Sequence, residues 1–224
     1  MDSLADMLRA SLWARSLTAD QFERVERSIV VRDVAAGQHV CRKGEPVEFW
    51  HGIVAGIVKM TGLSPAGKLT TLAGLPAGAW FGEGSLLKDE PRRYDVIALR
   101  DSRLALMPRA TFAWLLDNSI AFNRFLLFQL NERLGQFIGL VECGRLLDVD
   151  ARVARCLATM FNPVLYPGTK MQLAISQAEI GYLSGVSRQR VNQALKALER
   201  AGHLKVEYGG IVVLDLAGLR NHGT

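Results

Sequence analysis

The side chains between Ser187 and Ala201 are of types, and at a spacing, that suit recognition of another molecule by hydrogen bonds. The long polar side chains of this stretch are Arg188, Gln189, Arg190, Asn192, Gln193 and Lys196. Val191, Leu195 and Leu198 recur every three or four residues, so a helix would bury them and leave the polar set on its other face. Across a DNA major groove, arginine pairs with guanine, and glutamine or asparagine pairs with adenine. A solvated face on an ordinary pair of helices is the alternative.

A shorter helix before this one, and a glycine between the two, would position these side chains. Ser176 and Glu179 have the spacing of a capping box, in which each side chain bonds to the backbone N–H of the other residue. Gly185 would end that helix, and Ser187 would cap the next one. A short helix, a glycine turn and a polar helix form a helix-turn-helix pattern, whose second helix enters the major groove. The residues that we expect to contact DNA are Ser176, Gln177, Ser187, Arg188, Gln189, Arg190, Asn192, Gln193 and Lys196.

Two β-rich runs follow the second helix. They are HLKVEY and IVVLDL, with Gly209 and Gly210 between them. Paired glycines favour a hairpin turn, because they adopt positive φ angles without a steric penalty. A helix-turn-helix closed by a hairpin predicts a winged helix.

The charge of the chain is unevenly distributed. The 224 residues carry a formal net charge of +5, and the segment from Ala151 onward has nine basic and four acidic residues. All of the excess positive charge therefore lies in the segment that contains the helix-turn-helix. Contacts with nucleic-acid phosphates would use such a charge.

The sequence argues against several other classes of protein. Cys41, Cys143 and Cys156 are isolated, so no iron–sulfur cluster, which normally needs four cysteine ligands, is expected. The four histidines are scattered, and haem ligation by one of them is the alternative that remains open. No clustered nucleophile, base or metal-ligand set is evident, so we predict neither an enzyme nor a metal site. No apolar run approaches the ~20 residues of a transmembrane helix and no signal peptide is evident, so we expect a cytoplasmic protein.

The residue pattern of the rest of the chain changes from helical spacing to short β-rich runs. Residues 1–28 have helical spacing. From Val30 to about Pro108, short β-rich runs are separated by glycines, which predicts a β-barrel or sandwich. Pro65, Ala66 and Gly67 would form one of its hairpin loops.

Residues 119–147 predict one long helix with an apolar stripe made of Phe122, Leu126, Leu130, Leu134, Phe137 and Val141. One side of the helix can pack on its own domain, and the other suits the same helix of a second subunit. A dimer fits DNA binding, since two-fold proteins place two recognition helices about 34 Å apart. A helix buried wholly within one monomer is the alternative. The predicted fold is thus α+β, with a β-barrel domain at 1–118, a dimerisation helix at 119–147 and a winged helix-turn-helix domain at 148–224.

This order of parts resembles the superfamily of the cyclic-AMP receptor protein and the fumarate–nitrate reduction regulator (Crp/Fnr), over essentially the whole chain. The segments that carry the resemblance are IVAG at 53–56, FGEGSLL at 81–87, PRRYDVIA at 91–98, LLDVDARVARCL at 146–157 and the helix-turn-helix. It implies a jelly-roll barrel of the cyclic-nucleotide-binding type. It also implies a homodimeric transcription regulator that senses a signal in the barrel, binds a two-fold symmetric site on double-stranded DNA and contacts RNA polymerase.

The resemblance also implies an effector site. In cyclic-AMP-binding members a Gly-Glu pair holds the ribose and a later arginine holds the cyclic phosphate. Gly82 and Glu83 match the pair, and the register of the following strand favours Arg92 over Arg93 as the arginine. Pairing of Glu83 with Arg92 is the alternative. The predicted effector-binding residues are Gly82, Glu83, Arg92, Arg93, Tyr94 and Phe137.

Two departures from the family pattern shape the functional prediction. The positions that contact adenine in the cyclic-AMP binder fall at Phe137 and Ile138, which cannot make those hydrogen bonds, so we expect weak or no response to cyclic AMP. Two adjacent arginines could still hold another anion. In the recognition helix only Arg188 is retained, while Gln189 and Gln193 differ, so a different DNA sequence should be read. An effector-independent regulator with a vestigial barrel, or a cyclic-nucleotide sensor module acting on a protein partner, are the alternative functions.

Overall fold

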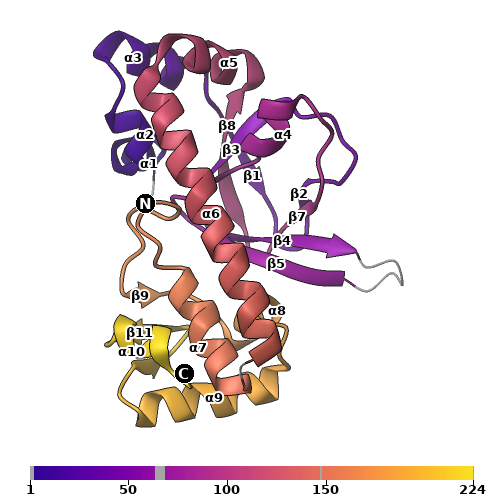
Figure 1. Ribbon diagram of the computed structural model, residues 1–224, viewed down its shortest axis with the longest axis vertical. Helices are drawn as coiled ribbons and strands as arrows, with labels where there is room; N and C mark the ends of the chain where they lie inside the picture. Colours follow the sequence, from indigo (N-terminus) through magenta and orange to yellow (C-terminus); the bar gives the residue numbers. More distant parts are fainter. Residues whose placement is uncertain (1–2, 64–68, 147, 224) are drawn as a thin grey trace. The chain divides into compact units, whose positions relative to one another are not determined.

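The computed structural model describes residues 3–63, 69–146 and 148–223 (Figure 1). The predicted loop at Pro65–Gly67 and the predicted helix end at Leu147 lie outside these residues. The chain divides into two compact units, one of residues 1–132 with 163–168 and one of residues 133–162 with 169–224. Each unit is described by itself below.

The first unit begins with three short helices, α1 (Leu4–Ala10), α2 (Leu12–Arg15) and α3 (Ala19–Ser28). Thr18 caps α3, and the side chain of Gln21 bonds back to the Thr18 backbone N–H in a capping box. This reciprocal pair satisfies two N–H groups that a helix start leaves unpaired. The helical prediction for this stretch is confirmed within the described residues 3–28.

Two four-stranded antiparallel sheets follow the helices. One has the order β1-β8-β3-β6, and the other the order β2-β7-β4-β5. The strands are β1 (Val30–Val34), β2 (His39–Cys41), β3 (Phe49–Ala55), β4 (Ile57–Leu63), β5 (Leu69–Pro76), β6 (Trp80–Phe81), β7 (Asp95–Ala98) and β8 (Ser102–Pro108). The predicted jelly roll is confirmed, but as two facing sheets and not as a closed barrel.

Side chains of β3 alternate between two environments, as period two requires. Trp50 and Val54 join a core with the helices of this unit, in which Trp13, Trp80 and Phe112 also lie. The rings of Trp50 and Trp80 have centroids 4.5 Å apart, and those of Trp13 and Trp50 5.4 Å apart. His51 and Ile53 therefore point to the opposite face of the strand.

Three further helices are α4 (Glu83–Lys88), α5 (Arg109–Asn118) and α6 (Ile120–Leu146). The long helix predicted at 119–147 is confirmed within the described residues. Its apolar stripe needs a correction, because Phe122 and Leu126 are buried in the core of the first unit and cannot meet a second subunit. The other stripe residues differ in exposure. Leu130 and Phe137 are partly buried, whereas Leu134 and Val141 are exposed. Further exposed apolar side chains on α6 are Ile120, Leu127, Phe128 and Ile138.

The second unit contains the end of α6, four more helices and a three-stranded antiparallel sheet of order β10-β11-β9. These elements are α7 (Val149–Thr159), β9 (Gln172–Leu173), α8 (Gln177–Ser184), α9 (Arg188–Arg200), β10 (Leu204–Glu207), β11 (Gly210–Val213) and α10 (Leu216–Asn221). Asp148 caps α7 by accepting from the Ala151 backbone N–H at 2.8 Å. The predicted winged helix is thus present.

The two glycines of the wing have different roles. Glu207 pairs with Gly210, so the turn consists of Tyr208 and Gly209, and only Gly209 has a positive φ, of 76°. Gly210 is the first residue of β11, and a Cβ there would lie 2.3 Å from the carbonyl oxygen of Leu173. The second glycine is therefore needed for the close approach of β9, and not for the turn that the sequence predicted.

Among the described residues, none of the helices combines the length and the apolar composition needed to cross a membrane.

Candidate functional site

The helix-turn-helix is fixed by its caps. Ser176 Oγ accepts from the Glu179 backbone N–H at 3.2 Å, and Glu179 Oε2 accepts from the Ser176 backbone N–H at 2.6 Å, so the predicted capping box is formed. Gly185 ends α8 in the left-handed conformation, with φ of 67°. Ser187 caps α9 with a longer bond of 3.4 Å from the Arg190 backbone N–H. The local signals therefore set the start, turn and restart of this motif.

The close approach of α8 to the turn that follows it requires glycine at position 181. A Cβ on Gly181 would lie 2.7 Å from the carbonyl oxygen of Val186, closer than real Cβ atoms approach. In the sequence Gly181 looks like an ordinary helical position, because its neighbour Val186 comes from the turn after the helix.

The two faces of α9 are sharply different. Val191, Ala194, Leu195 and Leu198 are at most 1% exposed. The opposite face carries the side chains predicted to contact DNA, and those of Arg188, Gln189, Arg190, Gln193 and Lys196 are exposed while Asn192 is partly buried. Arg190 Nη1 donates to Gln193 Oε1 at 3.1 Å, so these two neighbours orient each other.

Contacts that the sequence did not reveal hold the motif in its unit. Arg152 of α7 donates from Nη2 to the carbonyl oxygen of Ser184, the last residue of α8, at 3.1 Å. Glu199 of α9 accepts from the Val206 backbone N–H of β10 at 2.8 Å. The first bond satisfies a carbonyl group at the helix end, and the second joins α9 to the wing. Both bonds join separate elements of the unit.

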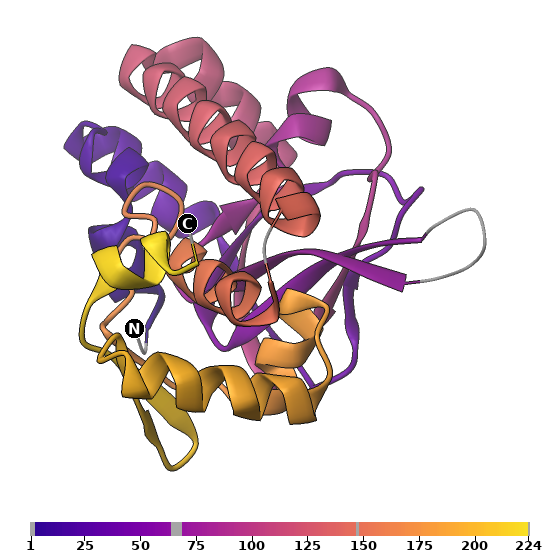
Figure 2. The same ribbon diagram turned by 60° about the horizontal axis from the view of Figure 1, so that its bottom comes forward.

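A groove of about 420 Å³ runs between the start of α8, the start of α9 and the wing. Ser176, Gln177 and Arg188 line it on the helical side, and Val206 and Gly209 on the wing side. Tyr208, in the turn between β10 and β11, is fully exposed. The hairpin of the wing is drawn in dark yellow in Figure 2. This tyrosine was not among the predicted DNA contacts, although an aromatic residue in a hairpin turn was visible in the sequence.

The predicted effector residues of the first unit separate into inward and outward ones. Gly82 precedes α4 in the left-handed conformation, and Glu83 is buried. Arg92 is buried at 4% exposure, whereas Arg93 lies on the surface. The strand register thus identifies the inward arginine correctly.

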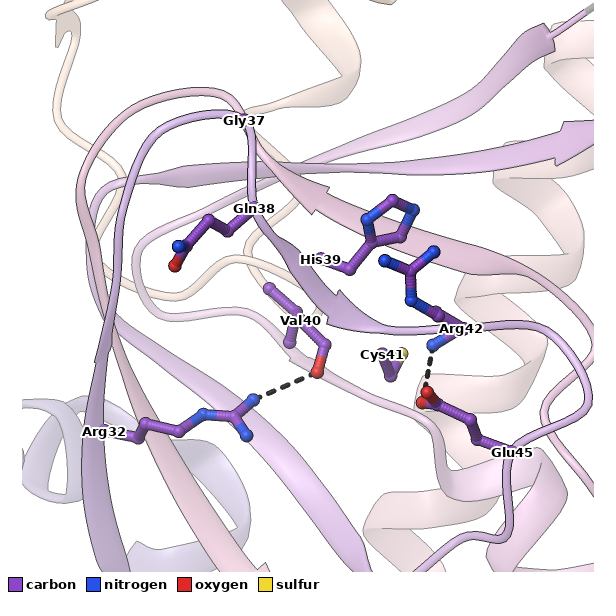
Figure 3. A pocket seen from close by; sticks show the side chains of 8 residues that line it. All are labelled: Arg32, Gly37, Gln38, His39, Val40, Cys41, Arg42 and Glu45. Carbon is purple, nitrogen blue, oxygen red and sulfur yellow. Dashed lines mark hydrogen bonds between the residues drawn. The ribbon is translucent and has the colours of Figure 1, made fainter.

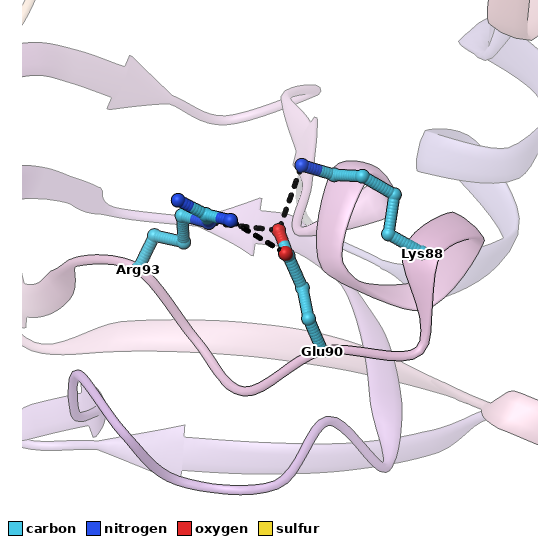
Figure 4. Close-up of polar contacts among 3 residues, drawn as sticks. All are labelled: Lys88, Glu90 and Arg93. Carbon is cyan, nitrogen blue, oxygen red and sulfur yellow. Dashed lines mark hydrogen bonds and ion pairs between the residues drawn. The ribbon is translucent and has the colours of Figure 1, made fainter.

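Arg93 needs a correction as an effector residue. Its Nη2 and Nε donate to the two carboxylate oxygens of Glu90 at 2.6 and 2.8 Å, and Lys88 contacts the same carboxylate at 2.8 Å (Figure 4). Hydrogen bonds from Arg93 and then Lys88 lower the pKa of Glu90 to about 2. The guanidinium is committed to this surface cluster. Tyr94 is partly buried, and Phe137 belongs to the second unit, so their roles stay predictions.

The guanidinium of Arg92 bonds within the jelly roll. Nη2 donates to the carbonyl oxygen of Phe49 at 2.9 Å and lies 3.0 Å from His51 Nδ1. Nη1 is buried without a hydrogen-bond partner. Arg92 therefore does not form the pair with Glu83 that the sequence left as an alternative.

A cavity of about 560 Å³ lies beside β2, where the chain turns from Gly37 to Glu45 (Figure 3). Arg32 of β1 reaches across to donate from Nη2 to the Val40 carbonyl oxygen at 3.0 Å. Cys41 lines the same cavity, and burial raises the pKa of its thiol to about 11, so it stays protonated. Within the described part of the chain, no group of three or more histidine, cysteine or acidic residues could hold a metal ion.

Comparisons with known proteins agree with this architecture. A family model of the cyclic nucleotide-binding domain matches residues 31–119, and one of the Crp-like helix-turn-helix domain matches residues 151–222. The cAMP-activated global transcriptional regulator CRP of Pasteurella multocida is 30% identical over 175 residues, which cover 76% of this chain and 83% of that protein. This chain belongs to the Crp/Fnr family.

Two further similarities extend the match. The CRP-like cAMP-activated global transcriptional regulator of Mycobacterium tuberculosis is 28% identical over 187 residues, covering 82% of this chain and 83% of that protein. The structure of FixK2 from Bradyrhizobium japonicum aligns with a TM-score of 0.71 at 21% identity, covering 88% of this chain and 98% of the other. The chain is therefore a Crp/Fnr-type DNA-binding transcription regulator with a cyclic-nucleotide-binding-type domain, and the prediction that it is no enzyme is confirmed.

Proposed function

We propose that this Crp/Fnr protein is a homodimeric transcription regulator that places α9 in the major groove of a two-fold symmetric DNA site. The observation that carries the proposal is the exposed polar face of α9, held by the caps and by Arg152. Arginine and glutamine side chains on a rigid helix can read base edges. The excess positive charge of the segment from Ala151 supports contacts with phosphates.

Dimerisation is proposed through α6. Leu127, Phe128, Leu134, Ile138 and Val141 are each more than half exposed on this helix. Large apolar side chains gathered on one element commonly mark a protein–protein contact. The proposed interface replaces Phe122 and Leu126 of the predicted stripe by Leu127 and Phe128. Sedimentation equilibrium would test it, with a dimer expected for the wild type and a monomer for Leu127→Asp/Phe128→Asp.

The proposed signal is a small molecule in the jelly roll other than cyclic AMP. Gly82, Glu83 and Arg92 match the residues that hold the nucleotide in cyclic-AMP-binding members, and their burial in this unit supports the proposal. By sequence position, Phe137 and Ile138 replace the residues that contact adenine in the cyclic-AMP binder, and they offer no hydrogen bonds. An effector-independent regulator is the second candidate, and the engagement of Arg92 by Phe49 and His51 favours it. Contact with RNA polymerase is proposed from the family alone.

Selection of DNA from a random pool by the purified protein would test the function. It should be run without ligand and with cyclic AMP, cyclic GMP and cyclic di-GMP. We expect enrichment of a symmetric sequence. Enrichment with one ligand would identify the effector, whereas enrichment without ligand would support constitutive binding. No enrichment under any condition, with affinity insensitive to salt, would favour the alternative in which the winged helix docks on a protein.

A further inference from the structure

His51 lies on the inward face of the jelly roll. On β3 it pairs with Phe81 of β6 and with Leu106 of β8. Its ring stacks on that of Phe81, with centroids 5.1 Å apart and planes at 21°, and it is 4% exposed. The backbone and the aromatic stack therefore fix the imidazole.

The imidazole and Arg92 satisfy each other. A guanidinium only donates hydrogen bonds, so Nδ1 of His51 accepts from Arg92 Nη2 in the tautomer that carries the ring proton on Nε2. The backbone of Arg92 is also fixed, since its N–H donates to the Glu45 carbonyl oxygen at 2.9 Å and its carbonyl oxygen accepts from Gly44 at 2.8 Å. Held at both ends, the arginine has little freedom to turn toward a ligand.

The other amino group of Arg92 is blocked. A Cβ built on Gly82 would lie 2.5 Å from Nη1, so this nitrogen rests directly against the start of α4. Nη1 has no hydrogen-bond partner there. One amino group of the guanidinium is thus occupied by protein acceptors and the other is covered by backbone.

Burial and the neighbouring positive charges keep His51 neutral. Burial, and then the positive charges of Arg92 and of Arg32 on β1, lower the pKa of His51 to about 3. The hydrogen bond that His51 accepts from Arg92 therefore persists at any physiological pH. His51 gives the arginine the acceptor that a ligand's oxyanion would otherwise supply.

We propose that His51 closes the effector site of this protein to phosphate-containing ligands by holding Arg92, and that it determines the effector specificity of the jelly roll. The inference rests on the effector site proposed above. A cyclic phosphodiester would have to displace both His51 Nδ1 and the Phe49 carbonyl oxygen before it could bond to Arg92. Removal of the imidazole takes away the acceptor and leaves a space beside the charge.

The test compares the wild type with His51→Ala by isothermal titration with inorganic phosphate and with cyclic AMP. Phosphate needs no base contacts, so it reports on Arg92 alone. We expect both probes to bind His51→Ala at least tenfold more tightly than the wild type. The double variant His51→Ala/Arg92→Ala should lose this gain, and His51→Gln, which keeps an acceptor, should behave as the wild type. His39→Ala, on strand β2 of the other sheet, is the matched control, and no gain is expected from it.

Three outcomes would overturn the proposal: equal binding by wild type and His51→Ala, tighter binding by the wild type, or a gain that survives loss of Arg92. A measurement on the wild type covers the case in which the variants do not fold. Nitrogen-15 NMR of the imidazole should show an unprotonated Nδ1 from pH 8 to pH 5, and protonation of His51 within this range would contradict the proposal. DNA binding by the same variants is a separate readout, so failure of the DNA-binding proposal would be recognised independently.

Discussion

The exposed face of α9 and the inward face around Arg92 both carry arginines beside other polar side chains, yet they differ in how those groups are satisfied. Gln189 and Lys196 face solvent, and Arg190 bonds to its neighbour Gln193 on the same surface. Arg92 is buried and bonded to Phe49 and His51. Donors on a rigid surface are available to a partner, whereas donors in an interior are committed to the fold. Changes on the exposed face of α9 should therefore alter binding with little effect on stability, and changes around Arg92 should alter stability and ligand access.

The largest expected effect is the acid sensitivity of the first unit. The pKa of His51 is lowered to about 3 in the folded protein, from an ordinary value of 6.5. The unfolded chain then binds more protons, so the contribution of His51 to stability is complete above about pH 6.5 and is lost as the pH falls toward 3. The loss should approach several kcal/mol, because each tenfold difference in proton affinity between the folded and unfolded chain corresponds to about 1.4 kcal/mol. Urea unfolding at pH 7 and pH 4 would measure it.

His51→Gln is the control, because its amide does not titrate. The difference in unfolding free energy between pH 7 and pH 4 should be smaller in this variant than in the wild type. An equal difference would assign the acid sensitivity to other groups.

The next effect concerns the buried face of α9. Leu198 is 0% exposed, so Leu198→Ala should lower the free energy of unfolding by about 2–5 kcal/mol through lost burial and a cavity. Chemical denaturation followed by circular dichroism would measure it. Lys196→Ala, on the exposed face of the same helix, should change stability by no more than about 0.5 kcal/mol. Equal destabilisation by both would contradict the division of α9 into two faces.

Substitution of Arg188 by alanine should weaken binding to the selected DNA by about 1–3 kcal/mol and relax specificity at one base position. The unfolding midpoint should stay close to that of the wild type, because Arg188 is exposed. Fluorescence anisotropy with the selected site and with single-base variants would measure both effects. An equal loss on every sequence would make Arg188 a phosphate contact.

The smallest effect expected is at the helix caps. Ser176→Ala removes one bond of the capping box and should cost about 1 kcal/mol of stability. Ser187→Ala should cost less, since its bond to Arg190 is 3.4 Å long and no reciprocal side chain supports it. Thermal unfolding of the two variants would rank them, and a larger loss from Ser187→Ala would contradict the comparison.

Much of the second unit follows from local sequence. The capping box at Ser176, the glycine at 185 and the period of Val191, Leu195 and Leu198 each act within a few residues, so the helix-turn-helix is confirmed as predicted. The fold of the first unit was predicted in outline, from the spacing of its glycines and β-rich runs and from the family resemblance. The residues that point into the jelly roll could be predicted only where they lie close to a strand of known register. Arg92, just before β7, is such a residue.

The sequence by itself determined the order of elements, their caps and the polar face of α9, because these depend on periodicities and on hydrogen bonds between near neighbours. Only the tertiary structure decided that Phe122 and Leu126 face their own core and that His51 bonds to Arg92. Each of these depends on how strands, helices and loops pack. The partner of His51 lies 41 residues away in the chain, and only the folding of the jelly roll brings them together.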